Sequence, residues 1–206
     1  MKHPSDADAL VTQARELGST LTLQAADALL LYEQLLRNPG VDLGVMASSD
    51  GPRIRTRHIL DSLRALGTIQ PGDADAYDLG SGGGLPGVVI AAAAPGLKVG
   101  LVETRRRRVA FLELAIERLG LPNASVIPSR IEDLSQPVDV CFARALAPIA
   151  DCWAIASPLL RAGGRLVYFA GHRADPGFIV PAGVRIQVRE TPVLESAGPL
   201  VIMTQQ

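Results

Sequence analysis

The hydrophobic and polar positions repeat with a helical period at the start of the chain. Apolar residues recur three or four positions apart after Ser5 and again after Thr22, and both residues are good helix N-caps. Segment 38–52 is rich in Asn, Gly, Pro, Ser and Asp, which indicates a loop. A third, basic and amphipathic helix is predicted after this loop, so that residues 1–71 form a helical extension. Its apolar face carries Ile59, Leu60, Leu63 and Leu66, whereas Arg53, Arg55, Arg57 and Arg64 are expected to point elsewhere.

After residue 71 the pattern changes to short apolar runs that alternate with helical stretches. This alternation is typical of βαβ units around a mainly parallel sheet. Parallel strands are expected at 76–79, 98–102, 124–127, 138–142 and 165–169, and a final antiparallel pair at 184–190 and 200–204. Helices are expected to begin near Pro86, Arg105 and Pro148, with a short turn near Glu132. The sequence therefore predicts a seven-stranded α/β domain over residues 72–206.

The composition is that of a folded globular chain, with 206 residues of which 48% are hydrophobic and 20% charged. Aromatic residues make up only 4%, which argues against a nucleic-acid surface built mainly from stacked rings. The formal net charge is −1, so any polyanion must meet a local basic patch. We find no secretory signal and no apolar run long enough for a membrane span, and we expect a cytoplasmic protein. Cys141 and Cys152 lack metal-site spacing and are expected to be buried, with no bound metal.

The most informative segment is 78–87, which reads DLGSGGGLPG. Its glycines permit a tight turn from strand to helix and let the backbone approach a ligand closely, which indicates a nucleotide-type cradle. No phosphate-loop lysine follows, so hydrolysis of a nucleoside triphosphate is disfavoured. Gly82, Gly84 and Gly87 also satisfy the dinucleotide fingerprint. An NAD-linked oxidoreductase is therefore one alternative function.

Three carboxylates near the strand ends bear on which cofactor binds. Asp78 precedes the first glycine and can accept from an ammonium group, whereas it would repel a diphosphate. Glu103, at the end of the second strand, is placed for two ribose hydroxyls. Glu132 either accepts from an adenine amine or is an ordinary exposed carboxylate in the first turn of a helix. S-adenosylmethionine, a ribosyl ligand with a cationic head and no phosphate, fits these residues best.

The densest charge cluster follows Glu103 directly and lies where a helix is expected to begin. A helix N-terminus already carries partial positive charge, so basic residues there are unfavourable. A polyanion partner would explain this cost, and four solvated arginines are the alternative. The cluster consists of Arg105, Arg106, Arg107 and Arg108.

These motifs together resemble the RsmG (GidB) family of bacterial small-subunit ribosomal RNA guanine-N7 methyltransferases. The resemblance rests on RHILDS at 57–62, on the glycine segment with its Leu-Pro-Gly close, and on short matches at 102–103, 111–112, 130–132 and 144–145. It covers nearly the whole chain in the right order. The family usually has Trp-Asn and Asn-Leu-Thr before the RHILDS helix and Lys-Gly after the fifth strand. This chain differs at 36–43 and at 170–173.

The resemblance implies a class I S-adenosylmethionine-dependent methyltransferase fold with a helical N-terminal extension that acts as a substrate lid. It further implies 16S ribosomal RNA, or a small-subunit assembly intermediate, as the partner of a monomeric enzyme without a metal. Cofactor contacts are implied at Gly80, Leu85, Ile131, Glu132 and Arg144. The two departures lie on the side expected to face RNA, so a non-catalytic, RNA-binding relative is a second alternative.

The exit of the fourth predicted strand, 141–145, bears on the atom that is methylated. It lacks both the Pro-Pro-aromatic stretch that holds an exocyclic amine and the Pro-Cys nucleophile of cytosine-carbon methylation. Guanine N7 has an in-plane lone pair, so in-line attack needs positioning and no general base. We expect Arg144 to position cofactor and guanine, the alternative being a surface arginine. His58 is either a substrate contact or a packing histidine.

Overall fold

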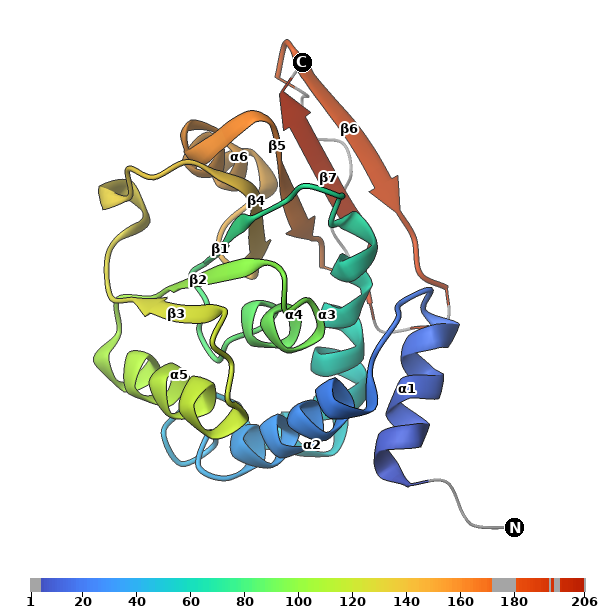
Figure 1. Cartoon of the computed structure of the whole chain (residues 1–206). Coiled ribbons are helices and arrows are strands. Elements are labelled where there is room, and N and C mark those ends of the chain that lie inside the picture. Colours follow the sequence, from blue (N-terminus) through green and yellow to red (C-terminus); the bar gives the residue numbers. More distant parts are fainter. Residues whose placement is uncertain (1–4, 172–180, 193, 195–196, 206) are drawn as a thin grey trace.

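A seven-stranded sheet forms the centre of the protein, whose computed structural model describes residues 5–171, 181–192, 194 and 197–205 (Figure 1). The strand order is β3-β2-β1-β4-β5-β7-β6. Pairs from β3 to β5 are parallel, and β7 is antiparallel to β5 and β6, which confirms the predicted architecture. The strands are β1 (Asp75–Leu79), β2 (Lys98–Val102), β3 (Ala124–Ile127), β4 (Val138–Arg144), β5 (Leu160–Phe169), β6 (Val184–Arg189) and β7 (Leu200–Gln205).

The apolar runs of the inner strands reflect burial on both faces of the sheet. All residues of β1 and β2 after the first are buried, as expected for parallel strands that helices cover on both sides. The predicted strand ranges agree closely with the structure except for β5, which begins at Leu160 rather than at 165. Gly163 and Gly164 interrupt its apolar pattern, so the first half of this strand is not visible as a periodic signal.

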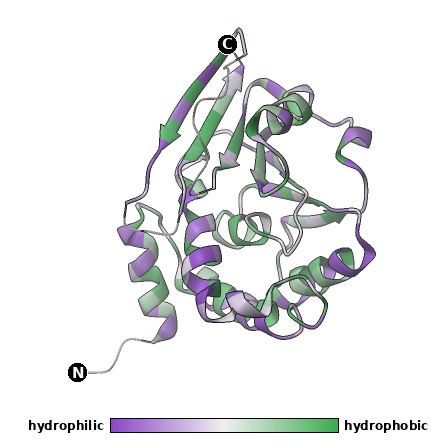
Figure 2. Cartoon of the chain, turned by 180° about the vertical axis from the view of Figure 1, so that it is seen from behind, coloured by the Kyte–Doolittle hydropathy of each residue, from purple (hydrophilic) through white to green (hydrophobic). Residues whose placement is uncertain are grey.

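Helices cover the two faces unequally (Figure 1). Helices α4 (Gly87–Ala93) and α5 (Arg106–Leu119) lie on one face, and α6 (Ile149–Ala156) lies on the other with the short turns η4 (Ile131–Asp133) and η5 (Ser157–Leu159) nearby. Hydrophobic residues follow the strands and the inner helix surfaces, and hydrophilic residues gather on the outer surfaces (Figure 2). Each face of the sheet therefore has its own hydrophobic core.

The N-terminal extension packs onto the helical layer and shares its core. Helices α1 (Asp6–Glu16) and α2 (Leu23–Arg37) begin at the predicted caps, because the Ser5 and Thr22 side chains accept from backbone N–H groups. Helix α2 packs against α4 and α5 (Figure 1). A run of helical turns then leads to β1: η1 (Ser48–Arg53), η2 (Ile54–Leu60), α3 (Asp61–Leu63) and η3 (Arg64–Thr68).

One part of the prediction for this third helical segment is wrong. Its apolar face is buried as expected, but Arg64 is only 6% exposed and forms an ion pair with Asp61. Arg55 binds Glu33 at 2.8 Å, and Arg57 binds Asp50 at 3.2 Å. The sequence could not show these partners, because most of them come from other elements or loops. The segment is therefore not a free basic face.

Both cysteines are buried and free, as predicted, Cys141 in β4 and Cys152 in α6. Among the described residues, no helix combines the length and the apolar character that a bilayer crossing requires. The same residues contain no cluster of His, Cys, Asp and Glu side chains that could hold a metal ion.

Candidate functional site

The cleft lies where the strand order reverses, between the carboxyl ends of β1 and β4. Open α/β sheets bind ligands at such switch points. Two cavities of about 680 and 550 Å³ open there, and we call them the first and the second cavity. Both are lined by Gly80, Arg108 and Ala145, so they adjoin and form one cleft.

The glycine loop that links β1 to α4 forms the floor of the first cavity. Gly80, Gly82 and Leu85, which the sequence predicts to contact the cofactor, line this cavity. Gly83 and Ser81 also line it. Three of the five loop residues that line this side are glycines, which offer only backbone to a ligand.

Two residues that were expected to contact the cofactor instead lie behind the loop. Asp78 is 1% exposed, and Gly84 is buried; neither lines the first or the second cavity. The Asp78 carboxylate accepts from the backbone N–H of Gly87 at 3.0 Å, and burial raises its pKa to about 6. Asp78 therefore does not face the cleft, where the sequence had placed it in contact with an ammonium group. Its side chain points into the core, where it holds the start of α4.

Glu103 lies at the end of β2, in the wall of the second cavity. Its carboxylate accepts from the backbone N–H groups of Gly82 at 3.1 Å, Thr104 at 2.8 Å and Arg105 at 2.9 Å. Arg108 approaches the same carboxylate at 3.4 Å. Burial opposes ionisation, but these hydrogen bonds prevail and lower the pKa of Glu103. An ionised acceptor therefore lies between the glycine loop and the start of α5.

The second cavity contains the other residues that were expected at the nucleoside. Ile131 and Glu132, in η4, line it together with Glu103, and Glu132 is exposed. The arginine cluster divides: Arg105 and Arg108 line this cavity, whereas Arg106 and Arg107 are exposed outside it. Glu103 offsets the positive charge at the N-terminus of α5, which the sequence pattern had marked as unfavourable.

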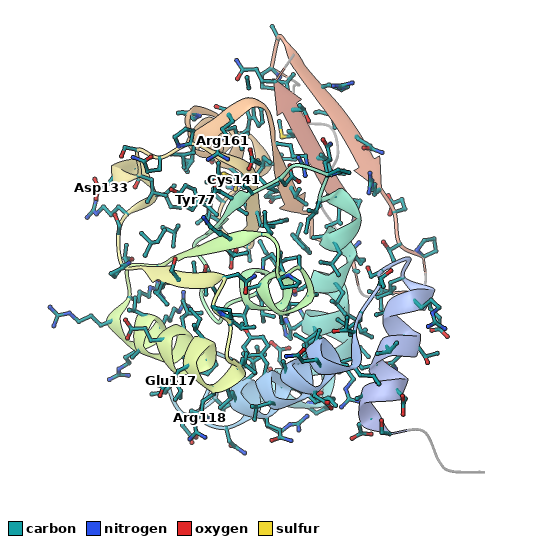
Figure 3. The ribbon with its side chains drawn as sticks, in the orientation of Figure 1. Tyr77, Glu117, Arg118, Asp133, Cys141 and Arg161 are labelled. Carbon is teal, nitrogen blue, oxygen red and sulfur yellow. The ribbon has the colours of Figure 1, made fainter. Side chains whose placement is uncertain are left out.

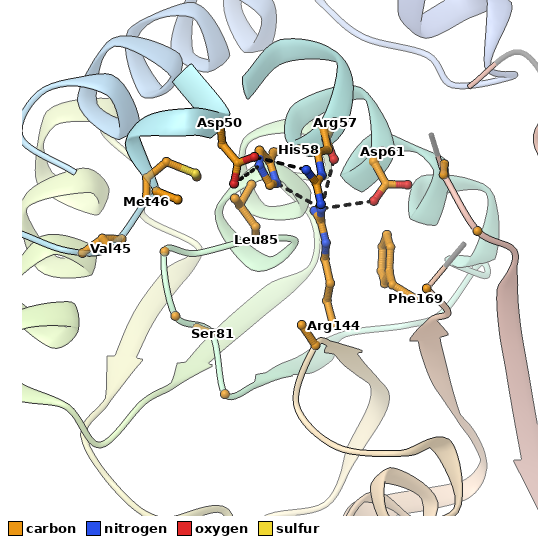
Figure 4. Close-up of a pocket in the computed structure, with 18 of the residues that line it drawn as sticks. Val45, Met46, Asp50, Arg57, His58, Asp61, Ser81, Leu85, Arg144 and Phe169 are labelled. Carbon is orange, nitrogen blue, oxygen red and sulfur yellow. Dashed lines mark hydrogen bonds and ion pairs between the residues drawn. The ribbon is translucent and has the colours of Figure 1, made fainter. Parts of the chain in front are cut away.

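Arg144, at the end of β4, reaches across the first cavity to the N-terminal extension (Figure 4). Its Nη2 donates to the backbone oxygen of Arg57 at 2.9 Å and to Nδ1 of His58 at 3.0 Å, and lies 3.5 Å from Asp61 Oδ2. The ring of Phe169 lies 6.0 Å from the guanidinium carbon. These contacts hold the guanidinium from one side.

The Nη1 group of Arg144 is buried and has no hydrogen-bond partner among the described residues. A buried donor without a partner is costly, and native proteins rarely leave one unless water or a ligand satisfies it. Arg144 lines the first cavity, and its unpartnered Nη1 group is buried beside that cavity's lining. The alternative of an ordinary surface arginine is not supported, since the side chain is only 17% exposed.

His58 is neutral in this arrangement. Arginine can only donate, so Nδ1 of His58 accepts and the ring proton lies on Nε2, 3.6 Å from Asp50. Burial and the neighbouring Arg144 lower the pKa of His58 to about 4. The histidine packs against Arg144 and lines the first cavity, and its contact with a substrate stays a prediction.

Sequence reasoning missed several residues that build this cleft. Asp61 lay within the quoted RHILDS segment but received no role, although it pairs with both Arg64 and Arg144. The turn at 45–47 lines the first cavity, and nothing in its composition indicates this. Of the divergent segment after β5, Ala170 and Gly171 line the cavity, and 172–173 lie outside the described residues.

The cleft has the chemistry of a site for an adenosine-type cofactor. The second cavity offers the Glu103 carboxylate for ribose hydroxyls and Ile131 and Glu132 for a base. The first cavity is lined by the glycine loop and by Arg144. The residues present therefore fit a nucleoside with a polar tail.

The family model described as rRNA small subunit methyltransferase G, or GidB, matches residues 25–177. The chain belongs to this family. A relative from Acidiphilium cryptum, named ribosomal RNA small subunit methyltransferase G, is 42% identical over 151 residues, which are 72% of this chain and 69% of the relative. A GidB-family relative of the same name from Stenotrophomonas maltophilia is 37% identical over 203 residues, or 96% and 93% of the two chains.

Solved structures show the same fold at low sequence identity. The crystal structure of a SAM-dependent methyltransferase from Aquifex aeolicus is 16% identical, has a TM-score of 0.57, and the match covers 75% of this chain and 94% of that chain. This likeness supports the class I methyltransferase fold expected for the GidB family.

Proposed function

We propose that this chain is a methyltransferase that uses S-adenosylmethionine to methylate N7 of a guanine in 16S ribosomal RNA of the small subunit. Membership of the GidB family decides between the two cofactors that the glycine pattern left open. The observation that carries the proposal is Arg144, which lines a cavity beside the glycine loop and has a buried Nη1 donor without a hydrogen-bond partner among the described residues.

The residues of the cleft have distinct proposed roles. Gly80, Gly82 and Leu85 hold the cofactor through the loop, Glu103 receives its ribose, and Ile131 and Glu132 hold its adenine. S-adenosylmethionine supplies an electrophilic methyl group when bound, and guanine N7 offers a lone pair that accepts it. The proposed role of Arg144 is to donate from Nη1 to the guanine O6 beside N7, which orients the base.

The titratable side chains of the first cavity support a target that needs no general base. Asp61 is paired with two arginines, and Asp50 with Arg57. His58 uses Nδ1 to accept from Arg144, so this nitrogen cannot take a proton from a substrate. Guanine N7 has no proton to lose, which matches this set of engaged groups.

We also propose that residues 1–71 form the substrate lid of a cytoplasmic, monomeric enzyme. The extension provides the wall of the first cavity opposite the sheet, through the turn at 45–47 and through Asp50, His58 and Asp61. A base that enters this cavity would lie between the extension and the carboxyl ends of the strands.

The experiment is methyl transfer from radiolabelled S-adenosylmethionine to small subunits from cells that lack this activity, with naked 16S RNA in parallel. Label is expected in the RNA, at a site that borohydride and aniline cleave, because 7-methylguanosine is sensitive to this treatment. Cofactor binding without transfer to either substrate would favour the non-catalytic relative. A thermal shift with NAD and none with S-adenosylmethionine would favour the oxidoreductase.

The exposed arginines at the start of α5 are expected to contact RNA phosphates. Removing Arg106 and Arg107 together should lower the salt slope of RNA binding by about 1.4, since each phosphate contact to a single strand contributes about 0.7. The measurement is RNA affinity over a range of salt concentrations.

The matched control replaces Arg15 and Arg118, which are also exposed, Arg118 at the far end of α5 (Figure 3). This double variant should keep the original slope. An unaltered slope in the Arg106 and Arg107 double variant would mean that these arginines are merely solvated.

A further inference from the structure

The glycine loop is held from behind by a residue of the N-terminal extension. Tyr32 lies in the middle of α2 and is fully buried. Its hydroxyl donates a hydrogen bond to the backbone oxygen of Gly83, which is 51 residues away in the chain. Gly83 lines the first cavity, so this bond joins the extension directly to the proposed cofactor surface.

The surroundings of this hydrogen bond are apolar. Tyr32 belongs to the same core as Leu29, Leu36, Val88 and Leu112. Burial raises the pKa of Tyr32 well above its ordinary value, so the phenol keeps its proton and remains a donor. A phenylalanine would bury the same ring, and therefore packing alone does not explain the hydroxyl.

The Gly83 carbonyl depends on this donor. Among the described residues it has no other hydrogen-bond partner, because the neighbouring N–H groups of Gly84 and Leu85 both donate to Ser81. A peptide oxygen that points into an apolar core without a partner is costly. Without the phenol, the loop would turn this oxygen towards water, and the first cavity would change shape.

The next glycine shows that the loop and the phenol fit together closely. A Cβ atom on Gly84 would lie 2.8 Å from the Tyr32 hydroxyl and 2.5 Å from Val88 Cγ2. Gly84 also has a φ of +87°, which side chains rarely adopt. The absence of a side chain here leaves the space that the tyrosine hydroxyl needs to reach the Gly83 oxygen.

The geometry points to Tyr32 as a positioning residue for S-adenosylmethionine: its hydroxyl sets the shape of the loop at Gly83 and thereby the affinity for the cofactor. This inference rests on the proposed function. It makes the extension a part of the cofactor site as well as a lid over the substrate. Glu103 holds the loop at Gly82 from the opposite side, so the two adjacent residues are fixed by different layers of the fold.

The test is Tyr32→Phe, which removes the hydroxyl and keeps the ring. The dissociation constant of S-adenosylmethionine, measured by calorimetry on the full chain, should rise by about 3- to 10-fold, the range for one neutral hydrogen bond. In steady state, KM for the cofactor should rise, whereas kcat and KM for RNA should stay near their original values. A purely structural role would lower the unfolding temperature without this selective change in KM.

The control is Tyr77→Phe. Tyr77 is buried on the other face of the sheet, and its hydroxyl has no hydrogen-bond partner among the described residues (Figure 3). Cofactor affinity should be unchanged in this variant. Equal affinity of Tyr32→Phe and the wild type, at a temperature where both are folded, would overturn the inference. If the wild type itself fails to bind S-adenosylmethionine, the proposed function falls first and this inference falls with it.

Discussion

Replacing Arg144 by lysine is expected to reduce methyl transfer by about 100- to 1,000-fold, the range seen when a positioned donor is removed from an active site. The guanidinium binds the Arg57 carbonyl, His58 and Asp61 through one nitrogen, and its other terminal nitrogen has no hydrogen-bond partner among the described residues and is proposed to bind the base. A lysine ammonium is a compact charge on one nitrogen, so it cannot bind the extension and the substrate base at the same time as the two nitrogens of a guanidinium can. The rate is measured with small subunits and labelled cofactor.

Lysine keeps the positive charge beside Asp61, so the fold should be retained, and thermal unfolding checks this. The matched control is Arg161→Lys. Arg161 pairs with Asp75 and Asp139 at the amino end of the sheet, away from the cleft (Figure 3). Its replacement should leave the rate unchanged. A rate for Arg144→Lys within about threefold of the wild type would mean that Arg144 only ties the extension to β4, since the expected loss is far larger.

Replacing Glu103 by alanine is expected to weaken the binding of S-adenosylmethionine by about 10- to 100-fold. A hydrogen bond to a charged group contributes about 1.5–3 kcal/mol, and each 1.4 kcal/mol is tenfold in affinity. The carboxylate also holds the backbone of Gly82, Thr104 and Arg105, so the change removes a proposed ribose contact and loosens the loop. Calorimetric titration of the cofactor measures the effect.

Two comparisons make this result specific. Glu113→Ala, on the exposed surface of α5, removes the same charge and should leave the affinity unchanged. Glu103→Gln keeps the shape and one acceptor oxygen, and should fall between alanine and the wild type. Unchanged affinity in the alanine variant would remove Glu103 from the cofactor site.

The strands and the glycine loop were predictable because their signals are local. A buried parallel strand is a continuous apolar run, and a turn that needs positive φ or close backbone approach requires glycine. The loop at 80–87 and Glu103 after β2 therefore show their positions in the sequence itself. Arg144 could be placed at the cleft once β4 was recognised, because the carboxyl ends of parallel strands meet at one edge of the sheet.

The direction in which a side chain points was not predictable for several of these residues. Asp78 and Gly84 lie within the glycine motif and yet face the core, because the loop turns them away from the cavity. Arg64 has the composition of an exposed residue but is buried, since Asp61 neutralises it. In each case a contact with a neighbouring group decides whether the residue faces the core or the solvent. The periodicity of the sequence carries no information about that contact.

The amino-acid sequence alone determined the order of strands and helices, the glycine loop and the family, because local patterns and short motifs are sufficient to predict each of them. Only the folded structure showed that Tyr32 of α2 holds the glycine loop from behind and that Asp61 and His58 of the third helical segment bind Arg144. These contacts join residues that lie about 50 to 90 positions apart in the chain. Their pairing depends on how one layer packs on another, which is a property of the whole core.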